Sequence, residues 1–420
     1  MSKLKDYCKI IPGYAFKSSD FNNGNSKVIK IADIEEHINC SQLGTVSSTG
    51  KDIDKYKVQN GDFVMSMTSA TQIGKIGIVE NVIVDTYINQ RLCKFSDFSN
   101  EVEPLYIYYA ITQPQFNKFI RDSADSKTLQ QNISHNTIGE YPIVLPDITT
   151  QKRIASILKS IDDKISNNNR INAELESMAK TIYDYWFTQF DFPDENGKPY
   201  KSSGGKMVWN EELKREIPEG WGDTTLNRYI GRITNGLNPR KNFVLGSGEN
   251  YYVTIKSLTG NDINWEACDR CDDVALSKIN ARSQLQVGDV IFSAIGTIGR
   301  TFYIQDPPTN WNISEASFTV RPNKDVPTDF FYALLNNDEI QMQADKKAMG
   351  STLRCLVMDS FTAIPYIEIP CTIMQKFANI VRPMYDAIYK NNKQNRELAS
   401  LRDWLLPMLM NGQVGFEGVE

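Results

Sequence analysis

Apolar residues recur at intervals of three and four along two long stretches of the chain, Ile154 to Tyr185 and Val381 to Leu405. This spacing is typical of a helix that packs along a narrow seam against a partner helix. Each stretch therefore predicts a helix of about 35–40 residues that cannot bury its apolar stripe alone. The predicted seam residues are Ile154, Ile157, Ile161, Asn168, Ile171, Leu175, Met178 and Ile182 in the first helix, and Val381, Met384, Ile388, Asn391, Asn395, Leu398 and Leu405 in the second.

We expect the two helices to pair with each other as an antiparallel coiled coil. The polar seam residues Asn168, Asn391 and Asn395 would then set the register and the orientation of the pair. Thr372 and Gln375 have the spacing of a capping box and predict the start of the second helix. The alternative is that each helix packs separately on its own domain.

Short apolar runs separated by turns precede each predicted helix. Residues 28–31 and 251–255 are expected strands, and residues 57–65 are expected to form a strand, a turn at Asn60-Gly61 and a second strand. Apolar residues near helical spacing predict helices within 103–120 and 330–340. The predicted fold class is therefore α+β, with one globular domain before each long helix.

The second half of the chain repeats the first. Thr150-Gln151-Lys152 matches Met374-Gln375-Lys376, which lies 224 residues further on, and other short matches keep the same order along the chain. Such a period predicts a tandem repeat. The expected boundaries are a first globular domain at 1–147, a helix at 148–190, a surface linker at 191–215, a second globular domain at 216–370 and a second helix at 371–412.

The composition adds limits to this picture. A hydrophobic share of 41% and a charged share of 23% are typical of folded globular proteins. The net charge of −5 weighs against a surface that is basic throughout, but it leaves room for local basic patches. No apolar run approaches the roughly 20 residues that span a bilayer. We therefore expect no membrane and a cytoplasmic location, which the seven scattered cysteines also favour.

Four segments resemble the specificity subunit of type I restriction–modification systems. They are residues 143–158, with Leu145-Pro146 leading into Gln151-Lys152-Arg153, residues 175–187, residues 217–221, which read Ile-Pro-Glu-Gly-Trp, and residues 398–407. The resemblance extends over essentially the whole chain. The globular part of each repeat is more diffuse, as is expected if the two copies recognise different bases.

The resemblance implies a non-catalytic subunit with two target-recognition domains, each reading one half of a split, asymmetric site in double-stranded DNA. It implies that the helices fix the spacing between the halves and dock two methyltransferase subunits that modify adenines. It also implies that motor–nuclease subunits complete the complex. No cofactor is expected in this chain, because S-adenosylmethionine, ATP and magnesium would be bound by the partner subunits.

Side chains that can recognise base edges or phosphates occur at the same repeat positions in both copies. Arg and Lys suit guanine and phosphates, Asn and Gln suit adenine, and Ser and Thr suit either base. For any one of these residues, the alternative is an ordinary solvated surface loop. The candidates in the first copy are Lys17, Ser66, Thr68, Ser69, Thr71, Gln72, Lys75, Arg91, Lys127, Thr128, Gln130, Gln131 and Asn132; those in the second are Asn238, Arg240, Lys241, Ser293, Thr297, Arg300, Lys346, Lys347, Ser351, Thr352 and Arg354.

Other motifs do not support chemistry in this chain. Asp306-Pro307-Pro308-Thr309 approaches the signature of an amino-methyltransferase, but Thr309 stands where an aromatic residue would stack on the flipped base. Cys268 and Cys271 form a lone Cys-x-x-Cys pair, whereas a structural zinc needs four ligands. No phosphate-binding loop of the Gly-x-x-x-x-Gly-Lys-Ser/Thr type occurs. No metal site is expected.

Two other functions compete with DNA recognition. The chain could be a coiled-coil scaffold that tethers two protein partners without any contact to DNA. It could also be the recognition half of a single-chain restriction–methylation enzyme, although such an enzyme would carry catalytic motifs upstream. The sequence does not decide which bases are read or how long the spacer is, because recognition depends on loop geometry and DNA shape.

Overall fold

The computed structural model describes residues 2–48, 52–69, 71–124, 131–240, 242–260, 262–351 and 353–414. The chain divides into two compact units. Unit 1 comprises Met1–Ile165 together with Glu397–Glu420, and unit 2 comprises Ser166–Arg396. Each of the predicted helical segments, 148–190 and 371–412, is therefore divided between the two units. Among the described residues, no helix combines the length and the apolar character needed to cross a membrane.

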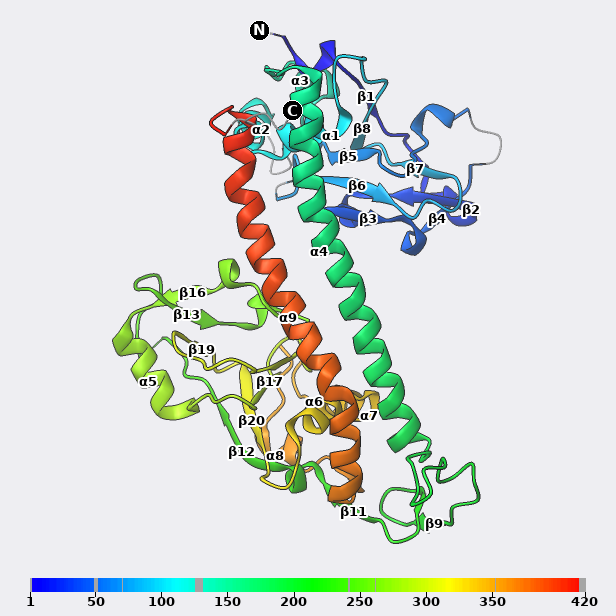
Figure 1. Cartoon of the computed structure of the whole chain (residues 1–420), viewed down its shortest axis with the longest axis vertical. Helices are drawn as coiled ribbons and strands as arrows, with labels where there is room; N and C mark the ends of the chain where they lie inside the picture. The colour runs from blue at the N-terminus through cyan, green and yellow to red at the C-terminus, as the bar shows by residue number, and fades with distance from the viewer. Residues whose placement is uncertain are drawn as a thin grey trace, which may run out of the picture. The chain divides into compact units, whose positions relative to one another are not determined.

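Unit 1 is built on a five-stranded sheet in the order β1-β8-β5-β6-β3 (Figure 1). The strands are β1 (Lys9–Pro12), β8 (Leu92–Ser96), β5 (Phe63–Ser66), β6 (Ile76–Glu80) and β3 (His37–Asn39). All neighbours are antiparallel except β3 and β6, which are parallel. A second sheet, β4-β2-β7, contains β4 (Thr45–Val46), β2 (Phe21–Ile29) and β7 (Thr86–Ile88), with β2 and β7 parallel.

Three short helices cover the large sheet of unit 1. They are α1 (Pro104–Thr112), α2 (Pro114–Ser123) and α3 (His135–Gly139). The helical pattern within 103–120 is split because Pro114 lacks an amide proton, so that one helix ends and the next begins there. Phe63, Phe95 and Tyr106 form one hydrophobic cluster with Leu158 of the first long helix and Leu409 of the second.

Unit 2 repeats this arrangement with additions. Its larger sheet has the order β12-β20-β17-β18, and its second sheet has the order β16-β13-β19. The bounds are β12 (Ile230–Asn235), β20 (Ser317–Pro322), β17 (Val290–Ser293), β18 (Thr301–Tyr303), β16 (Asp269–Cys271), β13 (Asn250–Val253) and β19 (Trp311–Ile313). Two-stranded pairs are formed by β9 (Met207–Asn210) with β10 (Arg215–Pro218), β11 (Gly222–Thr225) with β21 (Pro365–Glu368), and β14 (Leu258–Thr259) with β15 (Asp262–Ile263).

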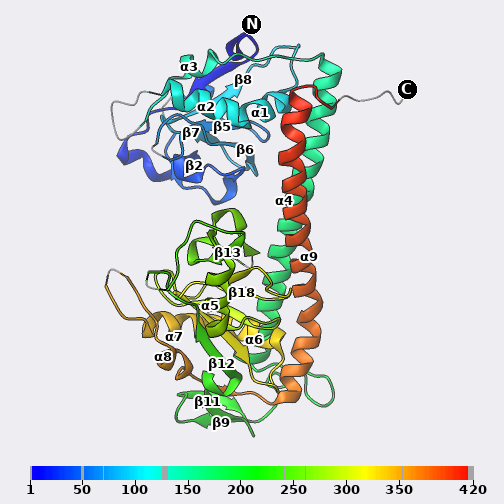
Figure 2. The same cartoon turned by 90° about the vertical axis from the view of Figure 1, so that its left-hand side faces the viewer.

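The helices of unit 2 are α5 (Asp273–Ser283), α6 (Thr328–Asn336), α7 (Asp338–Lys347) and α8 (Met358–Thr362) (Figure 2). A shared steric constraint shows how closely the two units correspond. A Cβ at Gly13 would lie 2.1 Å from the Asn89 carbonyl oxygen, and a Cβ at Gly236 would lie 1.9 Å from that of Ile313. Both glycines follow the first strand of the large sheet, where only a hydrogen fits.

The long helices are α4 (Ile148–Tyr183) and α9 (Cys371–Met410). Asp147 caps the start of α4, where its Oδ1 accepts the Thr150 amide at 3.0 Å. The predicted capping box of α9 is wrong, because α9 already begins at Cys371 and Thr372 lies inside it. At the other end α4 continues into a π-helical turn, Asp184–Thr188.

In unit 2 the two helices run antiparallel and meet through amide side chains. Asn168 donates to Asn395 Oδ1 at 2.8 Å, while Asn172 donates to Asn392 Oδ1 at 2.7 Å and accepts from Asn391 at 2.8 Å. The partner number falls as the number along α4 rises. Asn168, Asn391 and Asn395 are thus engaged between the helices, as their seam positions predict.

In unit 1 the helices meet through a charged cluster. Asp162 of α4 accepts a hydrogen bond from Tyr109 Oη at 2.7 Å and one from Arg402 Nη1 of α9 at 2.9 Å. Arg402 also pairs with Glu36. The Asp162 side chain is only 9% exposed, so its charge depends on these partners.

Two of the predicted seam residues of α4 are misplaced. Ile157 and Met178 are 37% and 52% exposed, whereas Leu158 and Ala179 are buried. The buried face follows steps of four and then three residues, from Ile154 to Leu158 and from Leu175 to Ala179, instead of three and then four. The alternation of steps of three and four residues was predicted correctly, but the order in which these steps follow each other was not.

The segment 191–215, predicted as a surface linker, is folded. Asp191 Oδ1 accepts the Ser202 amide at 2.7 Å, and β9 pairs with β10. The Phe192 ring is buried and stacks between Tyr200 and Trp221, with 4.8 Å between ring centroids on each side. These aromatic contacts and the strand pair hold the segment in place.

Replacing Arg402 by alanine is expected to destabilise unit 1 by about 3 kcal/mol or more, because Asp162 would keep a buried charge without its partner. Urea unfolding followed by circular dichroism measures the change. The matched control is Arg170→Ala, which removes an exposed ion pair with Glu174 and should cost less than about 0.5 kcal/mol. Equal effects of the two substitutions would contradict the role given to the Asp162 cluster.

Candidate nucleic-acid interface

The candidate residues of unit 1 gather where three chain segments meet beyond the end of β5. The Met67 amide donates to the Arg91 carbonyl at 2.9 Å, and the Ile133 amide donates to the Met67 carbonyl at 2.9 Å. The Ser69 amide donates to the Gln131 carbonyl at 3.2 Å. The β5–β6 hairpin, the turn at Arg91 and the segment at 131–133 therefore form one surface. Two windows that lie about 60 residues apart in the sequence come together there.

Unit 2 builds the same junction with the same backbone bonds. The Ala294 amide donates to the Ala316 carbonyl at 2.8 Å, and the Leu356 amide donates to the Ala294 carbonyl at 2.8 Å. The Gly296 amide donates to the Arg354 carbonyl, also at 2.8 Å. Each bond has its counterpart in unit 1. We call this surface the hairpin surface in both units: residues 67–69, 71–75, 91 and 131–133 in unit 1, and residues 294–300, 316, 351 and 353–356 in unit 2.

Three predicted contact residues are buried and structural. Ser66 is fully buried and donates to the Thr68 carbonyl at 2.9 Å. Ser293 is also fully buried; its hydroxyl donates to the Thr297 carbonyl and accepts the Arg300 amide, each at 2.7 Å. Thr68 is 5% exposed. These three positions are corrected from DNA contacts to residues that hold the hairpin, because a buried hydroxyl cannot reach a base edge.

Several other candidates are engaged by the protein itself. Arg354 forms an ion pair with Asp345, and Asn238 donates to Glu315 Oε1 at 2.7 Å. Arg300 Nη1 donates to the carbonyls of Ile255 and Leu258 at 3.0 Å. Ser69 Oγ accepts the amides of Thr71 and Gln72 at 3.2 Å. These contacts shape the loops, so each side chain would have to exchange a protein partner for DNA.

The remaining described candidates reach solvent to different degrees. Lys17 and Arg240, 223 residues apart, are exposed at equivalent positions after the first strand of each large sheet. The others that are exposed are Thr71, Lys75, Arg91, Asn132, Thr297, Lys346 and Ser351, while Gln72, Gln131 and Lys347 are half-buried. Lys127, Thr128, Gln130, Lys241 and Thr352 lie outside the described residues.

Sequence reasoning missed two kinds of residue near this surface. Lys118 and Arg121 are exposed on α2, which leads toward the 131–133 segment, and their signal was two basic residues on the polar face of an amphipathic helix. Met349 and Leu353 are 63% and 64% exposed in the corresponding segment of unit 2. Apolar side chains at such a position can contact thymine methyl groups, but a lone apolar residue in a loop carries no sequence signal of this role.

The cysteine pair shows no sign of a special reactivity. Cys271 is buried and the Cys268 thiol donates to the Asn264 carbonyl at 3.4 Å. Burial raises the pKa of both thiols, which keeps them protonated at neutral pH. Among the residues that the structure describes, no group of three or more His, Cys, Asp or Glu side chains is placed to hold a metal ion.

Comparison with known proteins gives consistent matches. Residues 1–177 match the family of the type I restriction modification DNA specificity domain. The chain is 24% identical to the MjaIX specificity subunit of Methanocaldococcus jannaschii over 84% of this chain and 77% of that one. It is 25% identical to the EcoBI specificity subunit of Escherichia coli, over 87% and 75% of the two chains.

A solved structure has a similar fold. The S subunit of a type I restriction–modification system from M. genitalium aligns with 97% of this chain and 94% of its own length, with a TM-score of 0.54 and 16% identity. At that identity the likeness concerns the fold alone. It extends over both units, including the long helix that begins at Ile148.

Replacing Ser293 by alanine is expected to reduce the free energy of unfolding by about 1–3 kcal/mol, because the Arg300 amide and the Thr297 carbonyl lose a buried partner. Ser351→Ala is the control, since Ser351 is exposed at the hairpin surface. Urea unfolding measures both variants. An unchanged stability of Ser293→Ala would show that the buried hydroxyl is not needed to hold the hairpin.

Proposed function

We propose that this chain, which belongs to the specificity-subunit family of type I restriction–modification systems, selects the DNA sequence on which such a complex acts. The observation that carries this proposal is the hairpin surface, built twice with the same backbone bonds on two units whose sheets share a strand order. Loops on a rigid sheet are a common way to present side chains that recognise a ligand. The alternative of a scaffold without any contact to DNA does not require this duplicated surface.

Each unit would read one half of a bipartite target. The two hairpin surfaces have the same framework but different side chains: Gln131 in unit 1 stands where unit 2 has Arg354. Different side chains on one framework favour different bases. The proposed target is therefore asymmetric.

The long helices would act as the spacer of this recognition device. Antiparallel contacts between α4 and α9 occur within unit 2, at Asn168 and Asn172, and within unit 1, at Asp162. They support an antiparallel coiled coil that relates two tandem recognition domains. For two related recognition domains, we expect half-sites that lie about one turn of the DNA helix apart, roughly 34–36 Å.

The chemistry would be carried out by other subunits. We propose that two methyltransferase subunits dock on this chain and that motor–nuclease subunits complete the complex, as in the restriction systems of its relatives. S-adenosylmethionine, ATP and magnesium would be bound by those partners. This chain would recognise the DNA sequence and would supply no catalytic group.

Exchanging residues 216–370 for the corresponding segment of a relative with another specificity is expected to change one half of the methylated motif only. This segment lies within unit 2 and interrupts neither long helix. Sequencing of methylated adenines after co-expression with the methyltransferase subunit would measure the motif. A change in both halves, or in neither, would contradict the assignment of one half-site to each unit.

Replacing Lys75 and Arg91 together by alanine is expected to weaken DNA binding of the assembled complex and to make the salt dependence of binding shallower. Each phosphate contact that is lost lowers the slope of log K against log salt by about 0.9. The exposed Lys201 of the segment 191–215 provides the control substitution. If Lys201→Ala had the same effect as the double variant, the location of the interface on the hairpin surface would be wrong.

A further inference from the structure

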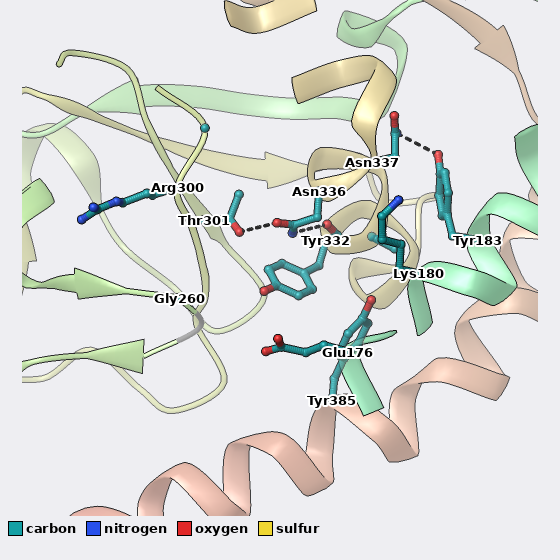
Figure 3. A pocket seen from close by; sticks show the side chains of 12 residues that line it. Glu176, Lys180, Tyr183, Gly260, Arg300, Thr301, Tyr332, Asn336, Asn337 and Tyr385 are labelled. Atoms are coloured by element: carbon teal, nitrogen blue, oxygen red, sulfur yellow. Dashed lines mark hydrogen bonds between the residues drawn. The ribbon is translucent and has the colours of Figure 1, made fainter. Parts of the chain in front are cut away.

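Unit 2 contains a cavity of ≈ 310 Å³ beside the two long helices (Figure 3). Its walls come from α4, from the β17–β18 hairpin, from α6 and from α9. The side chains that matter here are Glu176 and Lys180 of α4, Arg300 of the hairpin, Tyr332 of α6 and Tyr385 of α9. Gly299 and Arg300 belong to both the cavity and the hairpin surface, whereas the other residues that line the cavity lie outside the hairpin surface.

A comparison of the two repeats shows which side chain of unit 1 has no counterpart at the cavity of unit 2. With the offset of 223 residues that relates the long helices, Ala179 corresponds to Arg402 and Tyr385 corresponds to Asp162. In unit 1 the Arg402 guanidinium lines a cavity of ≈ 280 Å³ and is bonded to Asp162 at 2.9 Å. Unit 1 thus places a guanidinium of its own at this junction. Unit 2 has the methyl group of Ala179 at the corresponding position.

Unit 2 instead places an acid at the junction. Figure 3 shows the Glu176 side chain beside Tyr332 and Tyr385, with its carboxylate directed toward Gly260. Among the described side chains, no hydrogen bond or ion pair joins this carboxylate to a partner. Glu176 is exposed at the mouth of the cavity, and the partial burial of its carboxyl group there raises its pKa.

The two cations in the wall are already engaged elsewhere. The Lys180 ammonium is paired with Asp184 at 3.0 Å and with Asp338 at 2.9 Å. The Arg300 guanidinium donates to two backbone carbonyls, and Figure 3 shows it extending away from the cavity. Neither cation compensates Glu176, so the cavity keeps an unbalanced negative charge.

The aromatic side chains complete the environment of a cation site. The rings of Tyr332 and Tyr385 lie 5.1 Å apart at 85°, which makes a corner of two nearly perpendicular rings. Tyr303 stacks behind Tyr332 at 5.6 Å and supports it. Ring faces attract guanidinium and ammonium groups, and the Glu176 carboxylate can accept a charge-assisted hydrogen bond from either group.

We propose that this cavity binds an alkyl-guanidinium group, with Glu176 as its counter-ion and Tyr332 and Tyr385 as its aromatic walls. The group would occupy in unit 2 the role that Arg402 fills from within the chain in unit 1. It could come from a free metabolite or from an arginine side chain of a partner subunit, since both present the same group. This inference does not depend on DNA recognition.

The test is a titration of the full chain with N-ethylguanidinium, followed by isothermal calorimetry. Saturable binding to one site is expected, and Glu176→Gln should weaken it by about tenfold or more because the charged acceptor is lost while the shape is kept. Glu174→Gln is the matched control, since Glu174 lies on α4 but is exposed and paired with Arg170. Absence of saturable binding, or equal binding by the Glu176 variant, overturns the proposal.

A second variant tests the comparison between the units. Ala179→Arg should fill the cavity from within and abolish binding of N-ethylguanidinium, with folding verified by circular dichroism. If the folded Ala179→Arg variant still binds the probe with wild-type affinity, the site is not the cavity and the proposal fails. The Glu176→Gln result decides the matter alone if this variant does not fold.

The source of the group is decided by repeating the titration on the complex with the methyltransferase subunit. Loss of probe binding on assembly identifies a partner arginine, and retained binding identifies a free small cation. Either result is consistent with the guanidinium site. Failure of DNA recognition in the exchange experiment would leave the titration unaffected, so the two proposals can fail separately.

Discussion

A narrow apolar stripe on a long helix has to be covered, and this constraint organises the whole chain. Neither α4 nor α9 can bury its stripe alone, and each is covered partly by the other helix and partly by a globular core. Leu158 and Leu409 therefore belong to the same cluster as Phe63, although they are far apart in sequence. The sheets, the hairpins and the exposed loops are supported by hydrophobic cores, and residues of these helices complete those cores.

The polar contacts between the helices are different in the two units, and this difference has a physical meaning. Neutral amides meet in unit 2, at Asn168 and Asn172, whereas a buried carboxylate meets a guanidinium in unit 1, at Asp162. Both kinds of contact penalise a shifted register, since a slip would bury an unpaired polar group. Purely apolar seams would tolerate such a slip more easily.

Much of the fold could be predicted because period and repetition are properties of the sequence itself. The two helices, the α+β domains and the polar seam residues followed from spacing alone. The phase of the seam did not, because Ile157 and Leu158 are equally apolar and only the neighbouring core decides which is buried. The candidate surface was only partly predictable. Ser66 and Ser293 were predicted as DNA contacts from their hydroxyl groups, but both are buried, and burial depends on tertiary packing that the local sequence does not show.

The division of the chain into units has a consequence for how the protein is made. Unit 2 is one continuous stretch, Ser166–Arg396, whereas unit 1 needs both Met1–Ile165 and Glu397–Glu420. During synthesis, the core around Phe63 and Tyr106 has to wait for Leu409, which is translated after the whole of unit 2. Unit 1 is thus begun before unit 2 and completed after it, so a chain that stops between Arg396 and Leu409 would contain all of unit 2 and leave unit 1 with an open core.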